Sequence, residues 1–339
     1  MNKISLKEKT YAIEEAFLSP YATKSKDTRG RERAETPCEM RTEFQRDRDR
    51  IIYCKAFHRL KNKTQVFFSP EGDHYVTRLT HTLDVAQIAR SIARALSLNE
   101  DLSEAIALGH DLGHTPFGHS GERILNNLCP TGFEHNVQSL RVVDVLEKDG
   151  KGLNLTYEVR DGILNHKKSC TPATPEGMCV SLADRIAYIN HDLNDAFRAG
   201  ILTVSDVPKE ILKILGTSSK ERINTAINSI YKNSSDGEVK MDSAVEKASE
   251  ELRAFMFDKV YHSGTAKAEE GKAERMLTEM YSYFLDNTDK LPEQYVSLLE
   301  KYPCEQVVCD YISSMTDRYA VYMFNNIFVP KGWTFIDEK

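Results

Sequence analysis

The sequence predicts an all-α protein, and three observations support that fold class. Apolar residues recur at spacings of three and four along most of the 339 residues, which is the period of a helix with one buried face. No run alternates polar and β-branched residues convincingly, and only residues 68–76 could form one small β-hairpin. Hydrophobic residues make up 40% of the chain and charged residues 28%, which is the balance of an ordinary globular protein.

The chain divides into three predicted parts. Residues 1–39 are expected to form an N-terminal helix and an extended basic arm, because residues 18–38 are polar and punctuated by glycine and proline. Residues 40–200 are expected to form a helical core, and residues 201–339 a C-terminal helical layer packed on it. Residues 24–63 contain 13 Lys/Arg against 7 Asp/Glu in a chain of net charge −6. This stretch is either a surface for polyphosphate or nucleic acid or a solvated face of alternating charge.

The core helices follow from apolar spacing and capping residues. Residues 78–98 are apolar over most of the helix circumference, which predicts a central, buried helix. Residues 99–113 open with a capping signal and close on a glycine. Thr115 and Pro116 have the pattern of an N-cap and first residue of a helix that runs towards Asn127. Further helices are predicted at about 134–148, 156–167, 178–199, 206–215, 218–232, 240–262, 266–288 and 305–327.

Cysteine usage and hydropathy predict the compartment. The seven cysteines are scattered and form no CxxC pair, so neither a disulfide framework nor a cysteine zinc site is indicated. No stretch approaches the roughly 18 consecutive apolar residues of a spanning helix. The N-terminus lacks the apolar segment of a signal peptide. We therefore expect a cytoplasmic protein without a membrane segment.

Polar residues interrupt the apolar pattern at positions that suit a metal. His81 shares its predicted helix face with Val85 and Ile88, so its imidazole needs a partner or a metal. His110 and Asp111 end the next predicted helix, after the apolar run AIALG. A chain turn at that point can aim both side chains at one place.

The predicted helix 178–199 carries a row of acids. Asp184, Asp192 and Asp195 recur there at helical spacing together with Tyr188. A row of acids that faces inward is costly unless it is paired or binds a cation. Two imidazoles and two carboxylates suit a five- or six-coordinate divalent ion, of which Mn²⁺ is preferred here over Mg²⁺, Fe²⁺, Co²⁺ or Zn²⁺. Taken singly, His81 would more often be a satisfied core histidine and Asp184 more often an ion-pair partner, and it is their combination that favours a metal.

Three blocks of the sequence carry a resemblance to a known family. They are RLTH (78–81), HDLGHTPFGHSGE (110–122) and ADRIAYINHDL (183–193). With them, the chain resembles the HD-domain superfamily and, more narrowly, its bacterial deoxyguanosinetriphosphate triphosphohydrolase-like (dNTPase) branch. The likeness is dense over residues 28–200 and returns near 310–320. It implies an HD-domain helical core with additional C-terminal helices.

The resemblance also implies roles for matching residues. The metal ligands would be His81, His110, Asp111 and Asp184. The catalytic pair would be His119 and Glu122, with Glu122 orienting the imidazole for acid or base work. The phosphates would contact Arg78, His114, His135 and Arg185. The sugar or base would contact Tyr188, Asp192 and Gln65, with Asp192 accepting from the 3′-OH and Tyr188 stacking where a 2′-OH would otherwise sit.

The expected reaction is metal-dependent hydrolysis of deoxynucleoside triphosphates (dGTP or several dNTPs) to deoxynucleoside and tripolyphosphate. The resemblance further implies a homo-oligomer, a tetramer or hexamer, with an allosteric dNTP or single-stranded DNA as a candidate effector. One alternative is another HD phosphohydrolase, such as a 5′-nucleotidase or a cyclic-nucleotide or alarmone hydrolase. The other is a regulator that binds nucleotides or single-stranded nucleic acid on an HD scaffold. The sequence contains no GxxxxGK[ST], HExxH or GxSxG motif, so the commoner hydrolase templates are excluded.

Overall fold

The computed structural model describes residues 4–65, 76–261 and 264–331, and this part of the chain is all-α. The fold-class prediction is therefore confirmed. Within these ranges the extended contacts are isolated bridges, such as Thr64 with Thr77. The hairpin predicted at 68–76 lies, apart from its last residue, outside the described residues.

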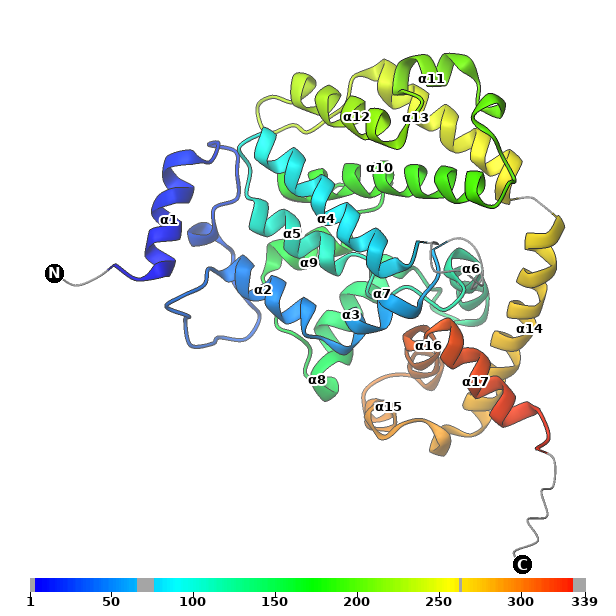
Figure 1. The fold of residues 1–339 in the computed structure, drawn as a ribbon. Helices are drawn as coiled ribbons and strands as arrows, with labels where there is room; N and C mark the ends of the chain where they lie inside the picture. Colours follow the sequence, from blue (N-terminus) through cyan, green and yellow to red (C-terminus); the bar gives the residue numbers. More distant parts are fainter. Residues whose placement is uncertain (1–3, 66–75, 262–263, 332–339) are drawn as a thin grey trace, which may run out of the picture.

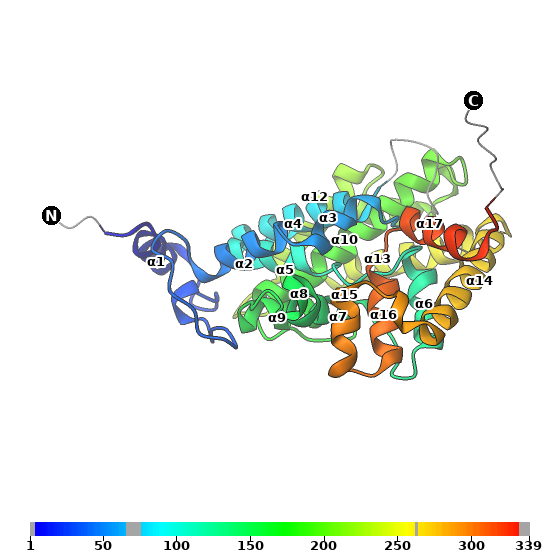
Figure 2. The ribbon, with the colours of Figure 1, turned by 90° about the horizontal axis from the view of Figure 1, so that it is seen from below.

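The N-terminal segment and the core contain ten of the labelled helices (Figure 1). They are α1 Leu6–Phe17, α2 Glu43–Ile52, α3 Lys55–Arg59, α4 Arg78–Ala95, α5 Glu100–Gly109, α6 Gly118–Leu128, α7 His135–Arg141, α8 Glu147–Gly150, α9 Tyr157–Leu164 and α10 Pro175–Arg198. Helix α1 begins with a capping box at Ser5 and lies at one end of the molecule (Figure 2).

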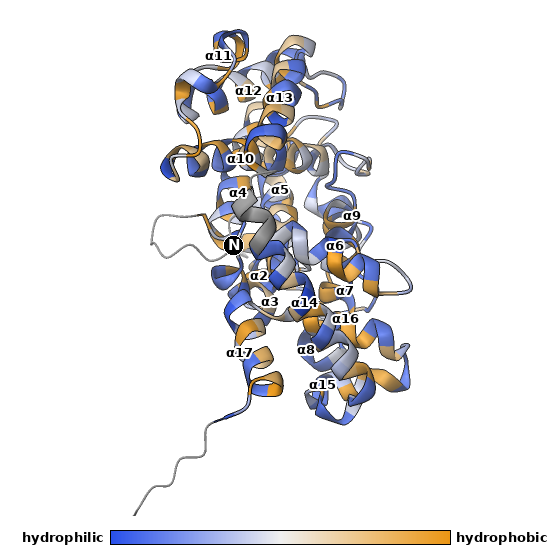
Figure 3. Cartoon of the chain, turned by 90° about the vertical axis from the view of Figure 1, so that its right-hand side faces the viewer, coloured by the Kyte–Doolittle hydropathy of each residue, from blue (hydrophilic) through white to orange (hydrophobic). Residues whose placement is uncertain are grey.

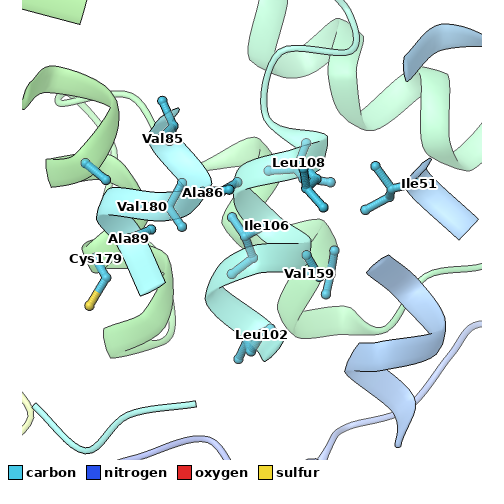
Figure 4. Packing of buried hydrophobic residues seen from close by; sticks show 14 of the residues in the cluster. Ile51, Val85, Ala86, Ala89, Leu102, Ile106, Leu108, Val159, Cys179 and Val180 are labelled. Atoms are coloured by element: carbon cyan, nitrogen blue, oxygen red, sulfur yellow. The ribbon is translucent and has the colours of Figure 1, made fainter. Parts of the chain in front are cut away.

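The core is built on α4 and α10, which pack against each other with α5 beside them. Figure 4 shows the contact, where small residues on α4 such as Ala86 and Ala89 lie against Val180 of α10. Ala89 and Val180 are fully buried, and the small side chains allow the two helix backbones to approach closely. This packing brings the first turn of α4, the end of α5 and the middle of α10 to one place.

The C-terminal helices form two groups around the core. They are α11 Lys209–Leu215, α12 Ser219–Asn233, α13 Ser243–Met256, α14 Gly264–Asp286, α15 Glu293–Val296, α16 Cys304–Ser314 and α17 Asp317–Phe328. Helices α11 and α13 bury apolar residues against the second half of α10, and α14 and α16 bury theirs against α6. Hydrophobic and hydrophilic residues alternate along these helices, as expected for amphipathic helices that cover a core (Figure 3).

Two of the predicted boundaries that differ from the structure lie at α6 and α17. Helix α6 begins at Gly118 rather than at Pro116, because the Thr115 hydroxyl donates to Gly118 O (3.0 Å) and Phe117 adopts a left-handed conformation with φ of 63°. The helix predicted at 305–327 is two helices. The first ends at Ser314 with Met315 as its C-cap, and Thr316 caps α17 by accepting from Tyr319 N at 3.2 Å.

Asp317, the first residue of α17, connects Thr64, which precedes α4, to Phe117, which precedes α6. One carboxylate oxygen of Asp317 accepts from Phe117 N (3.1 Å), and the other accepts from Thr64 N (3.1 Å) and the Thr64 hydroxyl (2.6 Å). Beside it, the buried Lys63 ammonium donates to Ser313 O (2.8 Å) and to His114 O. The C-terminal helices therefore hold the turn that precedes α6.

Replacing Asp317 by alanine is expected to lower the free energy of unfolding by about 2–4 kcal/mol, because it leaves the part-buried N–H groups of Thr64 and Phe117 without an acceptor. Asp317→Asn keeps one acceptor oxygen and should lose about half as much. Urea denaturation of the three proteins checks this. An unchanged midpoint for Asp317→Ala would show that the turn is held by other contacts.

Candidate active site

His110 and Asp111 lie where α5 ends, and both are almost fully buried (1% and 3% exposed). The Ser139 hydroxyl on α7 donates to His110 O (2.7 Å) and accepts from Gly113 N (2.9 Å), which fixes the turn. A Cβ atom on Gly113 would lie 2.2 Å from Ser139 N, so glycine is needed for this close approach.

The His110 imidazole presents a lone pair to two carboxylates. Its Nδ1 lies 2.6 Å from Ala107 O, and a carbonyl oxygen only accepts, so Nδ1 carries the proton. Its Nε2 is then an acceptor, 3.6 Å from an Asp111 oxygen and 3.9 Å from an Asp184 oxygen. In the part of the chain that the structure describes, this buried Nε2 has no hydrogen-bond partner. Acceptors that face one another in this way fit a cation between them.

His81 and Asp184 complete the same cluster from α4 and α10. His81 Nε2 lies 3.1 Å from an Asp184 oxygen, and His81 is 1% exposed. Burial opposes ionisation of Asp184, but the His81 contact and the nearby His110 hold the pKa of Asp184 below its usual range. The ligand atoms of His81, His110 and Asp111 all lie within 4.8 Å of one another. The chain therefore contains a His/Asp cluster that could hold a metal ion.

Arg78 lies beside this cluster at the first turn of α4. One of its terminal nitrogens donates to an Asp111 oxygen at 2.8 Å, and the residue is 1% exposed. Burial alone would raise the pKa of Asp111, but the charge of the Arg78 guanidinium helps to hold it well below the usual range. Among the described residues, Arg78 Nε and Nη2 have no hydrogen-bond partner. The guanidinium thus keeps donors for a phosphate oxygen.

Glu122 and three histidines lie next to the His/Asp cluster; the histidines are His114, His119 and His135. His119 Nδ1 lies 3.6 Å from a Glu122 oxygen, so the structure brings the predicted catalytic pair together. Glu122, however, makes its hydrogen bonds with His135, at 2.9 Å to Nδ1 and 2.9 Å to the backbone N. His135 stacks on the buried His114, with ring centroids 4.4 Å apart. The His119 side chain is 62% exposed and is the accessible member of the group.

The sequence analysis missed His166, which follows α9 and is 2% exposed. Its Nε2 lies 3.2 Å from His135 Nε2, and its ring centroid is 5.1 Å from that of His110. Burial and the neighbouring His110 and His135 lower the pKa of His166 to about 3, so it is neutral. The sequence contains a pattern that could have identified His166. This histidine comes after the apolar residues GIL of a predicted helix, much as His110 comes after AIALG.

A pocket of about 1170 Å³ opens beside this cluster and is large enough for a nucleotide. The predicted site residues that line it are Gln65, Arg78, Asp111, His114, His119, His135, Asp184, Arg185 and Tyr188. The predicted residues that lie outside its lining are His81, His110, Glu122 and Asp192.

The residues predicted to contact sugar and base differ in their accessibility. Tyr188 is half-buried and lines the pocket, and burial raises the pKa of its hydroxyl. Asp192, one turn further along α10, is 2% exposed, and burial followed by the nearby Asp195 raises its pKa well above the usual range. Gln65 is 6% exposed and lies in the lining at the end of the described segment 4–65.

Known proteins resemble the chain over nearly its whole length. The HD domain family matches residues 78–189, and the phosphohydrolase-associated domain matches residues 239–326. A deoxyguanosinetriphosphate triphosphohydrolase-like protein from Caldanaerobacter subterraneus is 56% identical over 97% of this chain and 98% of its own length. The chain belongs to this dGTPase-like family of HD-domain proteins. A relative of the same description from Clostridium tetani is 50% identical over 98% of both chains.

A solved structure supports the fold of the dGTPase-like chain. A phosphohydrolase from Bacteroides thetaiotaomicron superposes with a TM-score of 0.52 at 19% identity, over 82% of this chain and 67% of the other. The family and the His/Asp cluster together make the chain an HD phosphohydrolase with a candidate metal centre. Of the described helices, none is both long and apolar enough to cross a membrane.

Proposed function

We propose that the dGTPase-like chain hydrolyses deoxynucleoside triphosphates to deoxynucleoside and tripolyphosphate with Mn²⁺ as its metal. The observation that carries the proposal is the opening of a His/Asp cluster onto a nucleotide-sized pocket that also contains Arg78 and His119. The names of the relatives support the substrate class. The rival hydrolases would share the cluster, but they give no reason for the aromatic ring of Tyr188 beside it.

The donor set fits a divalent ion, held by His81, His110, Asp111 and Asp184. Such an ion withdraws charge from a phosphoryl oxygen and lowers the pKa of a bound water. Two imidazoles and two carboxylates are ligands that Mn²⁺ accepts. The carbonyl of Ala107 fixes the tautomer of His110 from outside the ligand set.

The chain's own residues account for the rest of the reaction. Arg78 would bind the phosphates with the donors that Asp111 leaves free, and Arg185, which also lines the pocket, would bind them as well. His119 would take the proton of the water that attacks the α-phosphorus, and solvent water would supply the proton for the leaving 5′-oxygen. Glu122, 3.6 Å from His119, would stabilise the imidazolium. The bond from the α-phosphorus to the 5′-oxygen breaks, which releases the intact tripolyphosphate.

A panel assay tests the substrate class. The purified protein is incubated with Mn²⁺ and each deoxynucleoside triphosphate, singly and mixed, and the products are separated by chromatography. Deoxynucleoside with tripolyphosphate supports the proposal, and any gain in the mixtures would reveal a nucleotide effector. Monophosphate or orthophosphate would favour the other HD hydrolases instead. Absence of turnover, with a salt-sensitive shift on single-stranded DNA, would favour the binding role.

Tyr188 is expected to select the deoxy sugar. Tyr188→Ala should lower the ratio of dNTP to ribonucleotide turnover by about tenfold, because a 2′-OH then finds space where the ring lay. Tyr188→Phe keeps the ring and should keep the ratio. Competition between dGTP and GTP, followed by chromatography, gives the ratio directly. Equal ratios for all three proteins would remove Tyr188 from sugar selection.

A further inference from the structure

Three ion pairs join the two matched segments of the chain across the pocket. Glu246 on α13 pairs with Arg185 on α10 at 3.4 Å. Glu270 on α14 pairs with Arg123 on α6 at 3.2 Å. Glu250 on α13 pairs with Lys168, which lies between α9 and α10. All six side chains line the pocket, as do Asp111 and Asp184 of the His/Asp cluster.

In all three ion pairs, the positive charge belongs to one matched segment and the negative charge to the other. The three cations belong to the part that matches the HD domain, residues 78–189, and the three acids to the part that matches the phosphohydrolase-associated domain, residues 239–326. Figure 1 shows why they meet, since α13 runs along α10 and α14 along α6. We call Glu246, Glu250 and Glu270 the counterion glutamates.

The three ion pairs are weak, and another ion can replace either partner. The side chains of the counterion glutamates are 42%, 52% and 27% exposed, and those of their partners 29%, 49% and 58%. Ion pairs with this much solvent contribute little to stability and are screened by salt. Glu270 has a second bond to the HD part, which it accepts from the Ser120 hydroxyl at 2.9 Å. Ser120 directly follows His119, so this contact lies next to the catalytic pair.

We infer that Arg123, Lys168 and Arg185 form a polyphosphate subsite. The counterion glutamates pair with these cations until a polyphosphate displaces them. A polyphosphate chain carries enough charge to replace all three carboxylates at once, whereas a single small anion replaces one. When the polyphosphate leaves, the three pairs re-form, so the glutamates also favour its release. The identity of the anion rests on the proposed function. The ion pairs across the pocket are observed independently of it.

Binding of inorganic tripolyphosphate to the full-length protein, purified without chelators, tests the exchange. By calorimetry at low salt, the triple variant Glu246→Gln, Glu250→Gln and Glu270→Gln should bind tripolyphosphate at least about tenfold more tightly than the unaltered protein. A matched control changes the net charge equally with Glu15→Gln, Glu238→Gln and Glu293→Gln, none of which lines the pocket. Its affinity should be unchanged. Equal or weaker binding by the counterion variant would overturn the inference.

A double-mutant cycle separates pairwise exchange from a general effect of charge. Lys168→Gln should weaken tripolyphosphate binding. Glu250→Gln should tighten it in the native background, but by less than about twofold in the Lys168→Gln background, because the cation to be released is then absent. Equal tightening in both backgrounds would overturn the inference. If this cycle holds while no dNTP is hydrolysed in a parallel assay, the proposed function fails and the counterion exchange stands.

Discussion

Replacing Asp111 by alanine is expected to remove the metal and to lower dNTP turnover by about 10⁴-fold or more, since metal catalysis contributes several kcal/mol to the barrier. Asp111 has two contacts at the centre of the site. It faces His110 Nε2 within the cluster, and it accepts from Arg78 at 2.8 Å. Its loss also leaves the Arg78 guanidinium buried without its carboxylate, which costs stability. Metal content by elemental analysis and turnover by chromatography are the two measurements.

Asp310→Ala is the matched control for Asp111→Ala. Asp310 is fully buried and pairs with Arg141 at 2.7 Å, but it lies outside the pocket lining. The control should therefore lose stability to a similar degree and still bind one metal equivalent. If Asp111→Ala retained both metal and turnover, the cluster at the end of α5 would not be the metal centre.

His119→Ala is expected to lower kcat by about 10²–10⁴-fold while the metal is retained. The reason is its position, because the side chain is largely exposed to the pocket and lies near Glu122 but is not part of the His/Asp cluster. His114, His119 and Glu122 form a second group that could hold a metal ion, so the metal content of the variant shows whether turnover is lost through proton transfer or through the metal. Steady-state kinetics with elemental analysis of the same sample make the separation.

An exposed histidine outside the pocket supplies the control for His119→Ala. His58 on α3 is exposed and does not line the pocket, so His58→Ala should leave kcat unchanged. Should His119→Ala turn over at the native rate, the proton would have to be handled by another group of the pocket, and His135 would be the next residue to replace.

Much of the fold could be predicted, because the determining interactions are local. The helix predicted at 78–98 is observed as Arg78–Ala95, since its apolar residues and its cap lie within its own sequence. The start of α6 could not be predicted in the same way. Phe117 N bonds to Asp317, 200 residues further along the chain, and that contact helps to hold the turn before Gly118. Local capping rules contain no information about such a partner.

In the candidate site, too, local sequence patterns predict some residues, whereas others are placed by packing between distant segments. His81, His110, Asp111 and Asp184 were proposed as one cluster, and the structure brings them together. Each carries a local signal, a polar residue within an apolar helical pattern. His166 was missed because its partners, His110 and His135, become neighbours only after α5, α7 and α9 have packed. The pairing of Glu122 with His135 rather than mainly with His119 likewise depends on the packing of α6 against α7.

The proposed reaction breaks the bond between the α-phosphorus and the 5′-oxygen of a deoxynucleoside triphosphate. Hydrolysis in ¹⁸O-labelled water, followed by mass spectrometry of the products, shows which bond breaks. We expect one ¹⁸O atom in the released tripolyphosphate and an unlabelled deoxynucleoside. Label in orthophosphate, pyrophosphate or a nucleoside monophosphate would show that a different bond breaks and would overturn the proposed reaction.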